Sequence, residues 1–168
     1  MIVIQMHGEP GSGKSTLARA LGRALPAVVI DKDVIHSALL RAGVDPTVAG
    51  GASYESMRAL ARPLLEDGRS IIFDSPCFWP QIETDGRAIA ADFGAPWMMI
   101  ECVCPSDLVE HRLATRERLE SNPLQRGAGA GRPGMYVPAC ERLALDTRRP
   151  VEELIGDALT FIHAGITR

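Results

Sequence analysis

The sequence predicts an α/β fold in which a parallel sheet is covered by helices on both faces. Short apolar runs, rich in β-branched residues, alternate along the chain with longer segments of helical period. Several of these runs are apolar at every position, which is typical of strands buried on both faces. The 168 residues contain no repeat or low-complexity stretch, and we expect a single domain over residues 1–168.

Five apolar runs are expected to form the strands, and the segments between them are expected to form helices. The expected strands are residues 2–6, 27–30, 70–73, 97–103 and 143–145. Apolar residues at helical spacing predict helices over residues 15–25, 54–66, 81–93, 106–119 and 151–162, and a further helix ends at Arg41. Ser106 and Asp107 suit the start of the helix at 106, and Pro150 suits the start of the last helix.

Composition and charge exclude several classes of protein. Eighteen Lys and Arg against twenty-one Asp and Glu give a net charge of −3, which argues against a basic nucleic-acid coat. Four Phe, two Trp and two Tyr are too few for a row of base-stacking platforms. No apolar run approaches the ~20 residues that cross a bilayer, and the apolar start lacks a basic leader. The four cysteines form no C-x-x-C pair and are expected as reduced thiols, which favours a cytoplasmic location.

Residues 8–15, Gly-Glu-Pro-Gly-Ser-Gly-Lys-Ser, match the phosphate-binding pattern G-x-x-x-x-G-K-[ST] at every fixed position. The glycines allow the backbone to aim successive N–H groups into one concavity, and the following helix adds its own unpaired N–H groups. Lys14 would place its charge on the β- and γ-phosphates, and the Ser15 hydroxyl is a hard oxygen ligand for Mg²⁺. We therefore expect ATP and Mg²⁺ as cofactors. The residues expected to bind the nucleotide are Gly8, Glu9, Pro10, Gly11, Ser12, Gly13, Lys14, Ser15 and Thr16.

With this motif the chain resembles the P-loop NTPases, and among them the small-molecule kinases of the adenylate-kinase-like group. It is similar to the AAA_33, zeta-toxin-like and chloramphenicol phosphotransferase-like kinases, a group that also holds gluconate, shikimate and adenylylsulfate kinases. The resemblance spans nearly the whole chain. It implies a three-layer P-loop NTPase fold with a five-stranded parallel sheet in the order 2-3-1-4-5. A short lid is expected at residues 120–136, which are rich in Gly and Pro, and a plain surface loop is the alternative.

Three acids lie at the ends of expected strands, where a parallel sheet faces its ligand. The resemblance implies that Asp33 accepts or orients the proton of the acceptor hydroxyl, and that Asp31 binds the acceptor or a Mg²⁺-bound water. The alternative for Asp33 is that it only caps the helix that runs to Arg41. Asp74 ends an apolar strand, as a Walker B acid does, and would hold a Mg²⁺-bound water or contact the acceptor. Otherwise Asp74 is a turn residue.

Phe78 and Trp79 follow Asp74 in a segment that two prolines stiffen. We expect both aromatic side chains to bind the acceptor as walls of its pocket. A hydrophobic plug on the core is the alternative. His7 lies one residue before the phosphate-binding motif, and it either faces the acceptor or packs as a hydrogen-bonded imidazole at the strand end.

Arg112 and Arg116 are four residues apart and therefore share one face of a helix. The resemblance implies that Arg112 packs near the nucleotide base and that Arg116 reaches the transferring phosphate, so both count as catalytic candidates beside Lys14 and Asp33. Planar donors of this kind stabilise the charge of the transition state. The alternative is a solvated helix face paired with Glu110 and Glu117. Further arginines expected near the lid are Arg118, Arg126 and Arg132.

The last expected strand ends in Leu-Asp-Thr, which related kinases often show before a helix that begins with Pro. By this resemblance, residues 147–150 would touch the nucleotide base through backbone atoms. Asp146 is otherwise a turn residue.

The expected function is transfer of the γ-phosphate of ATP to a hydroxyl of a small molecule, such as an antibiotic, a sugar, a nucleoside or a related metabolite. Positioning and electrostatics would supply much of the catalysis. The alternatives are a nucleotide or polynucleotide 5′-hydroxyl kinase and a non-catalytic ATP-dependent switch. The sequence contains no Asn-Lys-x-Asp motif, which disfavours a GTPase, and no motif identifies the acceptor. The expected partner is a small hydroxylated acceptor, with no long nucleic-acid track and no membrane.

Overall fold

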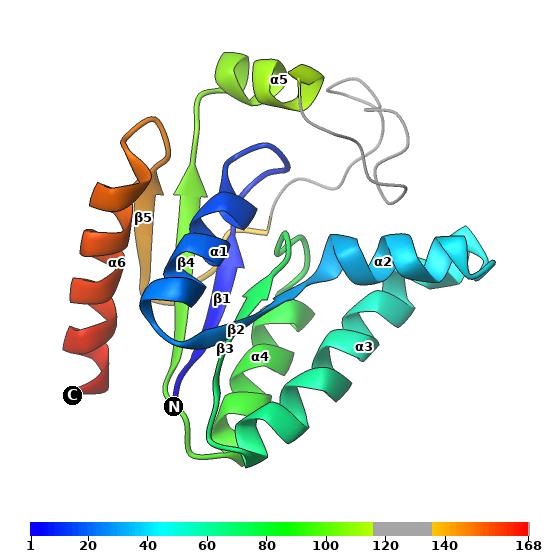
Figure 1. The fold of residues 1–168 in the computed structure, drawn as a ribbon, viewed down its shortest axis with the longest axis horizontal. Helices are drawn as coiled ribbons and strands as arrows, with labels where there is room; N and C mark the ends of the chain where they lie inside the picture. The colour runs from blue at the N-terminus through cyan, green and yellow to red at the C-terminus, as the bar shows by residue number, and fades with distance from the viewer. Residues whose placement is uncertain (116–135, 168) are drawn as a thin grey trace.

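The computed structural model describes residues 1–115 and 136–167, which form a three-layer α/β fold (Figure 1). Its strands are β1 (Val3–His7), β2 (Ala27–Asp31), β3 (Ser70–Asp74), β4 (Trp97–Val103) and β5 (Arg142–Asp146). They pair in parallel in the order β2-β3-β1-β4-β5, which confirms the predicted fold class and strand order. β1 lies in the middle of the sheet and is buried at every residue, while β2 and β5 form the edges.

Helices cover both faces of this sheet. They are α1 (Lys14–Ala24), α2 (Lys32–Arg41), α3 (Pro46–Glu66), α4 (Pro80–Asp92), α5 (Ser106–Thr115) and α6 (Val151–Ile166). α1 and α6 lie on one face and α3 and α4 on the other, while α5 lies beyond the carboxyl ends of the strands (Figure 1). None of the described helices is long and apolar enough to cross a membrane.

The alternation of side chains along each strand divides the apolar core into two parts. On β1, Ile4 points to one face and packs in a cluster with Leu21 of α1 and Ile162 of α6. Val3 points to the opposite face and packs in a second cluster with Met57 of α3. Because both faces are covered, the open part of the sheet is its carboxyl edge. The N-termini of α1 and α2 lie at that edge, which is where parallel sheets bind ligands.

The helix predicted over residues 54–66 begins much earlier than expected, at Pro46. Asp45 caps it by accepting a hydrogen bond from the backbone N–H of Thr47 at 2.8 Å, and Pro46 occupies the first turn. The early turns contain Gly50 and Gly51, which are poor helix formers and hide the helical period in the sequence. The helix predicted over residues 106–119 corresponds to α5, which the structure describes from Ser106 to Thr115. The last four residues of the prediction, 116–119, lie outside the described part of the chain.

Candidate active site

The phosphate-binding motif forms a loop between β1 and α1 at the carboxyl edge of the sheet. Gly13 is the N-cap residue of α1 and has a positive φ of 93°, a conformation that glycine adopts without a steric penalty. The turn is closed by the Ser12 N–H, which donates to the Glu9 carbonyl at 3.0 Å. α1 begins directly at Lys14, so the unpaired N–H groups of its first turn lie beside the loop. This is the arrangement that binds phosphate groups at a helix N-terminus.

The first glycine of the motif tolerates no side chain. Gly8 has a φ of 132°, and a Cβ at this position would lie 2.5 Å from the carbonyl oxygen of Cys102 on β4. This contact is with backbone, which cannot move aside cheaply. Gly8 therefore lets the loop cross the end of β4 at close range.

We expect Gly8→Ala to destabilise the protein by about 2 kcal/mol or more, because it adds backbone strain to a clash. In a domain of this size the melting temperature should fall by at least ~4 °C. The matched control is Gly156→Ala on α6, where a Cβ would meet nothing within 4 Å. Replacing a glycine in a helix in this way should leave stability unchanged or raise it slightly. Equal melting temperatures for Gly8→Ala and the wild type would contradict the close approach to β4.

Lys14 folds back over the loop that precedes it. Its side-chain ammonium donates a hydrogen bond to the Glu9 carbonyl at 2.6 Å and lies 3.5 Å from Ser12 Oγ. The residue is only 7% exposed. Burying a cation is costly without compensating oxygen contacts, and the loop supplies them. The ammonium therefore lies among the oxygen atoms of the loop, close to where a phosphate would bind.

Asp74, at the end of β3, accepts a hydrogen bond from the Ser15 hydroxyl. It is 4% exposed, and its Oδ2 atom has no hydrogen-bond partner among the described residues. Burial raises the pKa of Asp74 from its usual 3.8 to about 6. The Ser15 hydrogen bond and the charge of Lys14 act in the opposite direction, while the charges of Asp31 and Asp33 add to the rise. The structure thus brings the predicted Walker B acid to the phosphate-binding motif.

This pair of oxygen groups fits Mg²⁺. Mg²⁺ prefers oxygen ligands and commonly takes only one or two from the protein, with the rest from water and phosphate. Ser15 offers a hydroxyl, and Asp74 offers a buried carboxylate with one oxygen still unpartnered. Among residues 1–115 and 136–167, no cluster of three or more His, Cys, Asp or Glu side chains could hold a metal ion by itself.

The raised pKa of Asp74 predicts a pH-dependent stability for the protein without ligands. Since the folded-state pKa (about 6) lies above the usual value (3.8), the folded state binds the proton more tightly than the unfolded chain. The stability gained from protonation is complete below pH 4 and is lost as the pH rises through 6, a change of up to about 3 kcal/mol. Asp74→Asn removes this titration. Its free energy of unfolding, measured with urea, should therefore exceed that of the wild type by more at pH 7 than at pH 4. A constant difference would contradict the prediction.

Asp31, rather than Asp33, caps α2. The Asp31 side chain accepts hydrogen bonds from the backbone N–H groups of Asp33 at 2.9 Å and Val34 at 3.2 Å. It also forms an ion pair with Arg19 at 3.1 Å. The alternative that Asp33 serves only as the helix cap is therefore wrong, because the N-cap residue of α2 is Asp31, two residues earlier. In the parallel register Asp31 lies directly beside Asp74, so the two acids are neighbours at the sheet edge.

Asp33 lies in the first turn of α2, beside a cation that sequence reasoning missed. The Lys32 ammonium lies 3.4 Å from Asp33 Oδ1 and donates to His36 Nδ1 at 3.1 Å. It also lies 5.9 Å from the centre of the Tyr54 ring, within cation–π range. Burial and then the charge of Lys32 lower the pKa of His36, while the charge of Asp33 acts in the opposite direction. The sequence did contain an indication that Lys32 belongs to the site, because Lys14 and Lys32 are the only lysines of the chain.

Three aromatic side chains gather on the α3 side of this acid group. Tyr54 donates a hydrogen bond from its hydroxyl to the Pro76 carbonyl at 3.0 Å. Its ring meets Trp79 edge-on at 6.4 Å between centres, and Trp79 meets Phe78 in the same manner at 5.8 Å. Trp79 is 49% exposed, so it does not plug the core, whereas Cys77 in the same segment is fully buried. The rings leave an accessible aromatic surface near Asp33.

On the other side of the phosphate loop, α5 packs directly against it. A Cβ on Gly11 would lie 2.8 Å from Leu113 Cγ, so the helix and the loop are in contact. Arg112 donates to the hydroxyl of Thr147 at 3.0 Å and to the Thr147 carbonyl at 2.8 Å. It is half-buried, and the alternative of a solvated arginine paired with Glu110 is wrong for this residue. Arg112 thus lies beside the loop, and its place near the nucleotide base stays a prediction.

Several predicted residues lie outside the described part of the chain. Arg116 is among them, and so is the predicted lid at 120–136 except for its last residue. The further arginines near the lid, Arg118, Arg126 and Arg132, also lie outside it. Their roles stay predictions.

His7 packs as a buried imidazole and does not open onto the site. It is 3% exposed, with Nδ1 at 3.3 Å from a carboxylate oxygen of Glu101 and Nε2 at 3.0 Å from the Tyr136 carbonyl. Arg142 pairs with the other oxygen of Glu101 at 2.7 Å. The hydrogen-bonded alternative is therefore the one that the structure shows.

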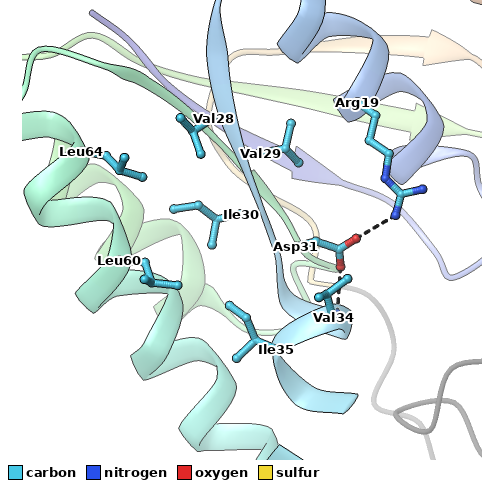
Figure 2. A pocket seen from close by; sticks show the side chains of 9 residues that line it. All are labelled: Arg19, Val28, Val29, Ile30, Asp31, Val34, Ile35, Leu60 and Leu64. Atoms are coloured by element: carbon cyan, nitrogen blue, oxygen red, sulfur yellow. Dashed lines mark hydrogen bonds and ion pairs between the residues drawn. The ribbon is translucent and has the colours of Figure 1, made fainter. Parts of the chain in front are cut away.

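An apolar groove lies next to this site, along the edge strand β2. It has a volume of about 490 Å³, and Asp31 and Arg19 form its polar end (Figure 2). Its apolar walls come from β2, α2 and α3 and consist of Val28, Val29, Ile30, Val34, Ile35, Leu60 and Leu64. None of the residues of the phosphate loop lines it.

Comparison with known proteins shows the family to which the chain belongs. The family model AAA_33, described as an AAA domain, matches residues 3–129. An uncharacterized protein of Mycobacterium tuberculosis is 32% identical over 121 residues, which are 65% of this chain and 24% of that protein. The chain thus spans about a quarter of the length of the curated relatives that it matches.

Solved structures share the fold at low sequence identity. The Mycobacterium tuberculosis APS kinase CysC in complex with AMPPNP and APS superposes with a TM-score of 0.75 at 22% identity, covering 96% of this chain and 97% of that one. An unliganded sugar kinase from Janibacter superposes with a TM-score of 0.68 at 19% identity, covering 97% and 95%. With the phosphate loop, the strand order and the family match together, the chain belongs to the AAA_33 family and has the P-loop kinase fold.

Proposed function

We propose that the protein is an ATP-dependent kinase that transfers the γ-phosphate to a hydroxyl group of a small molecule. One observation carries the proposal. The phosphate loop brings Lys14 and Ser15 beside Asp74, within range of the charge of Asp33. A cation, a hydroxyl, a buried acid and a second acid at one edge of a parallel sheet are the groups that phosphoryl transfer requires.

In this proposal the loop binds the triphosphate through its backbone N–H groups and those of the first turn of α1. Lys14 exchanges its contact with the Glu9 carbonyl for phosphate oxygens, which compensate its charge better. Ser15 and Asp74 would hold Mg²⁺, which neutralises phosphate charge when bound. The unpartnered oxygen of Asp74 supports this assignment.

Asp33 would accept the proton of the acceptor hydroxyl. The hydroxyl oxygen forms a bond to the γ-phosphorus, the bond to the β–γ bridging oxygen breaks, and ADP leaves as the phosphate ester forms. Because the cap of α2 is provided by Asp31, the Asp33 carboxylate is not used for capping. Arg112 would neutralise charge on the nucleotide side, and Arg116 remains a predicted contributor on the transferring phosphate.

The acceptor would lie between Asp33 and the aromatic group formed by Tyr54, Phe78 and Trp79. The exposed ring of Trp79 suits one face of a small cyclic molecule, such as a sugar ring or a planar base. The net charge of −3 disfavours a long nucleic-acid track. The four cysteines are free thiols, which supports a location in the reducing cytoplasm.

The test is a transfer assay with the purified chain, Mg²⁺ and ATP labelled in the γ-phosphate. A panel of sugars, nucleosides, nucleotides, DNA with a free 5′-hydroxyl and hydroxylated antibiotics serves as acceptors. Label should appear on at least one small compound, and it should form far more slowly with Asp33→Asn. Label on DNA alone would support a polynucleotide kinase instead. Tight ATP binding with no label on any compound would support a nucleotide-dependent switch.

A further inference from the structure

Thr147 joins three parts of the candidate site through its hydroxyl group. This residue follows β5 directly and is 8% exposed. Its Oγ1 donates to the carbonyl of Ser12 in the phosphate loop at 2.7 Å, a contact that bridges 135 residues of sequence. The same oxygen accepts a hydrogen bond from Arg112 at 3.0 Å. A hydroxyl has one proton to donate and lone pairs to accept, and here both capacities are used.

The arginine is held at a second point on the same residue. Arg112 Nη2 donates to the main-chain carbonyl of Thr147 at 2.8 Å, so the two arms of the guanidinium contact two oxygens of one residue. The planar fork of an arginine suits this geometry, and a lysine cannot reproduce it. Thr147 is itself fixed to the sheet, because its N–H donates to the Val103 carbonyl at 3.0 Å. Its hydroxyl also lies 3.3 Å from that carbonyl.

This anchored guanidinium lies against the backbone of the phosphate loop. A Cβ on Gly13 would lie 3.3 Å from Thr147 Cβ and 3.4 Å from Arg112 Nη1. Gly13 is the N-cap residue of α1, directly before Lys14. The arginine is therefore held at the point where the loop passes into the helix.

We propose that Thr147 is a positioning residue for the nucleotide: its hydroxyl fixes the guanidinium of Arg112 against the phosphate loop. The inference rests on the proposed function, since Arg112 acts on a bound nucleotide. A free arginine side chain samples many rotamers, and ordering it on binding costs affinity. Because Thr147 already orders the guanidinium of Arg112, binding of the nucleotide does not have to order it. This contact also gives the threonine of the Leu-Asp-Thr sequence a side-chain role, and the predicted backbone contact of residues 147–150 with the base stays a prediction.

The test compares two replacements of Thr147 in the full chain. Thr147→Val keeps the shape and removes the hydroxyl, whereas Thr147→Ser keeps the hydroxyl. Binding of a non-hydrolysable ATP analogue with Mg²⁺ is measured by calorimetry. We expect Thr147→Val to weaken binding about tenfold and Thr147→Ser to stay within about twofold of the wild type. The matched control is Thr160→Val, whose hydroxyl bonds only to the Gly156 carbonyl of its own helix α6, and it should bind normally.

A double-mutant cycle separates positioning from support of the loop. If Thr147 acts through Arg112, then Thr147→Val should change the affinity of an Arg112→Ala protein by less than about twofold. The same tenfold loss in both backgrounds would mean that the hydroxyl only supports the loop, and it would overturn the proposal. Arg112→Lys gives a readout that leaves Thr147 intact. Since lysine cannot make both contacts, it should also weaken binding about tenfold, and wild-type affinity would overturn the proposal.

Failure of the proposed function looks different in the same experiment. A wild-type chain that does not bind the analogue would refute nucleotide binding itself, and the inference about Thr147 would fall with it. A wild type that binds, together with Thr147→Val that binds equally well, would refute only the role of Thr147.

Discussion

Replacing Lys14 with methionine should lower the rate of phosphate transfer by about 10²–10³-fold and weaken binding of Mg²⁺ and ATP together. Methionine has nearly the same length and flexibility as lysine but carries no charge. The ammonium of Lys14 already lies among the oxygen atoms of the loop, at 2.6 Å from the Glu9 carbonyl. Without this cation, a triphosphate in the loop loses one of the charges that compensate its own. Transfer is followed with γ-labelled ATP, and affinity by calorimetry.

The matched control is Arg62→Met, which removes a cation from the surface. Arg62 pairs with Asp92 at 3.0 Å, and both side chains are about half exposed. Exposed pairs of this kind contribute little to stability, so neither transfer nor affinity should change. Wild-type affinity in Lys14→Met would contradict the assignment of residues 8–15 as a nucleotide site. An equal loss in both variants would indicate a general effect of charge rather than a contact with phosphate.

The features that the sequence predicted well are local or belong to a common pattern. Eight consecutive residues identify the phosphate loop, and the spacing of apolar residues predicts the strand and the helix that flank it. The strand order came from the resemblance to P-loop kinases, and the parallel pairing of β1 with β3 and β4 confirms it. Asp74 was expected at the phosphate loop because strand ends of a parallel sheet meet at one edge.

The features that were missed depend on contacts between distant residues. Sequence alone could not choose between Asp31 and Asp33 as the cap of α2, because either position can begin a helix within the usual uncertainty of its ends. The start of α3 was hidden by two glycines. The hydroxyl of Thr147 contacts Ser12 only because β5 and β1 end at the same edge of the sheet. The spacing of residues along the chain does not predict this contact.

Replacing Asp33 with asparagine should lower the rate of transfer by about 10²–10⁴-fold while nucleotide affinity stays within about twofold of the wild type. The amide has the size of the carboxylate but cannot accept the acceptor proton. Asp33 does not cap α2, and in the proposed function it lies on the acceptor side of the phosphate loop. The fold should therefore survive the change, with a melting temperature within ~3 °C of the wild type.

The matched control for this prediction is Asp31→Asn. Asparagine caps helices as well as aspartate does, so the start of α2 is retained. The variant loses only its charge, including the ion pair with Arg19, whose side chain is mostly exposed. If Asp33 is the base and Asp31 acts only as the helix cap, Asp31→Asn should keep most of the activity. Full activity in Asp33→Asn with loss in Asp31→Asn would instead transfer the role of base to Asp31, which lies beside Asp74 in the sheet register. Loss in both variants with normal affinity would mean that the two acids act together, as neighbours whose charges both reach Asp74.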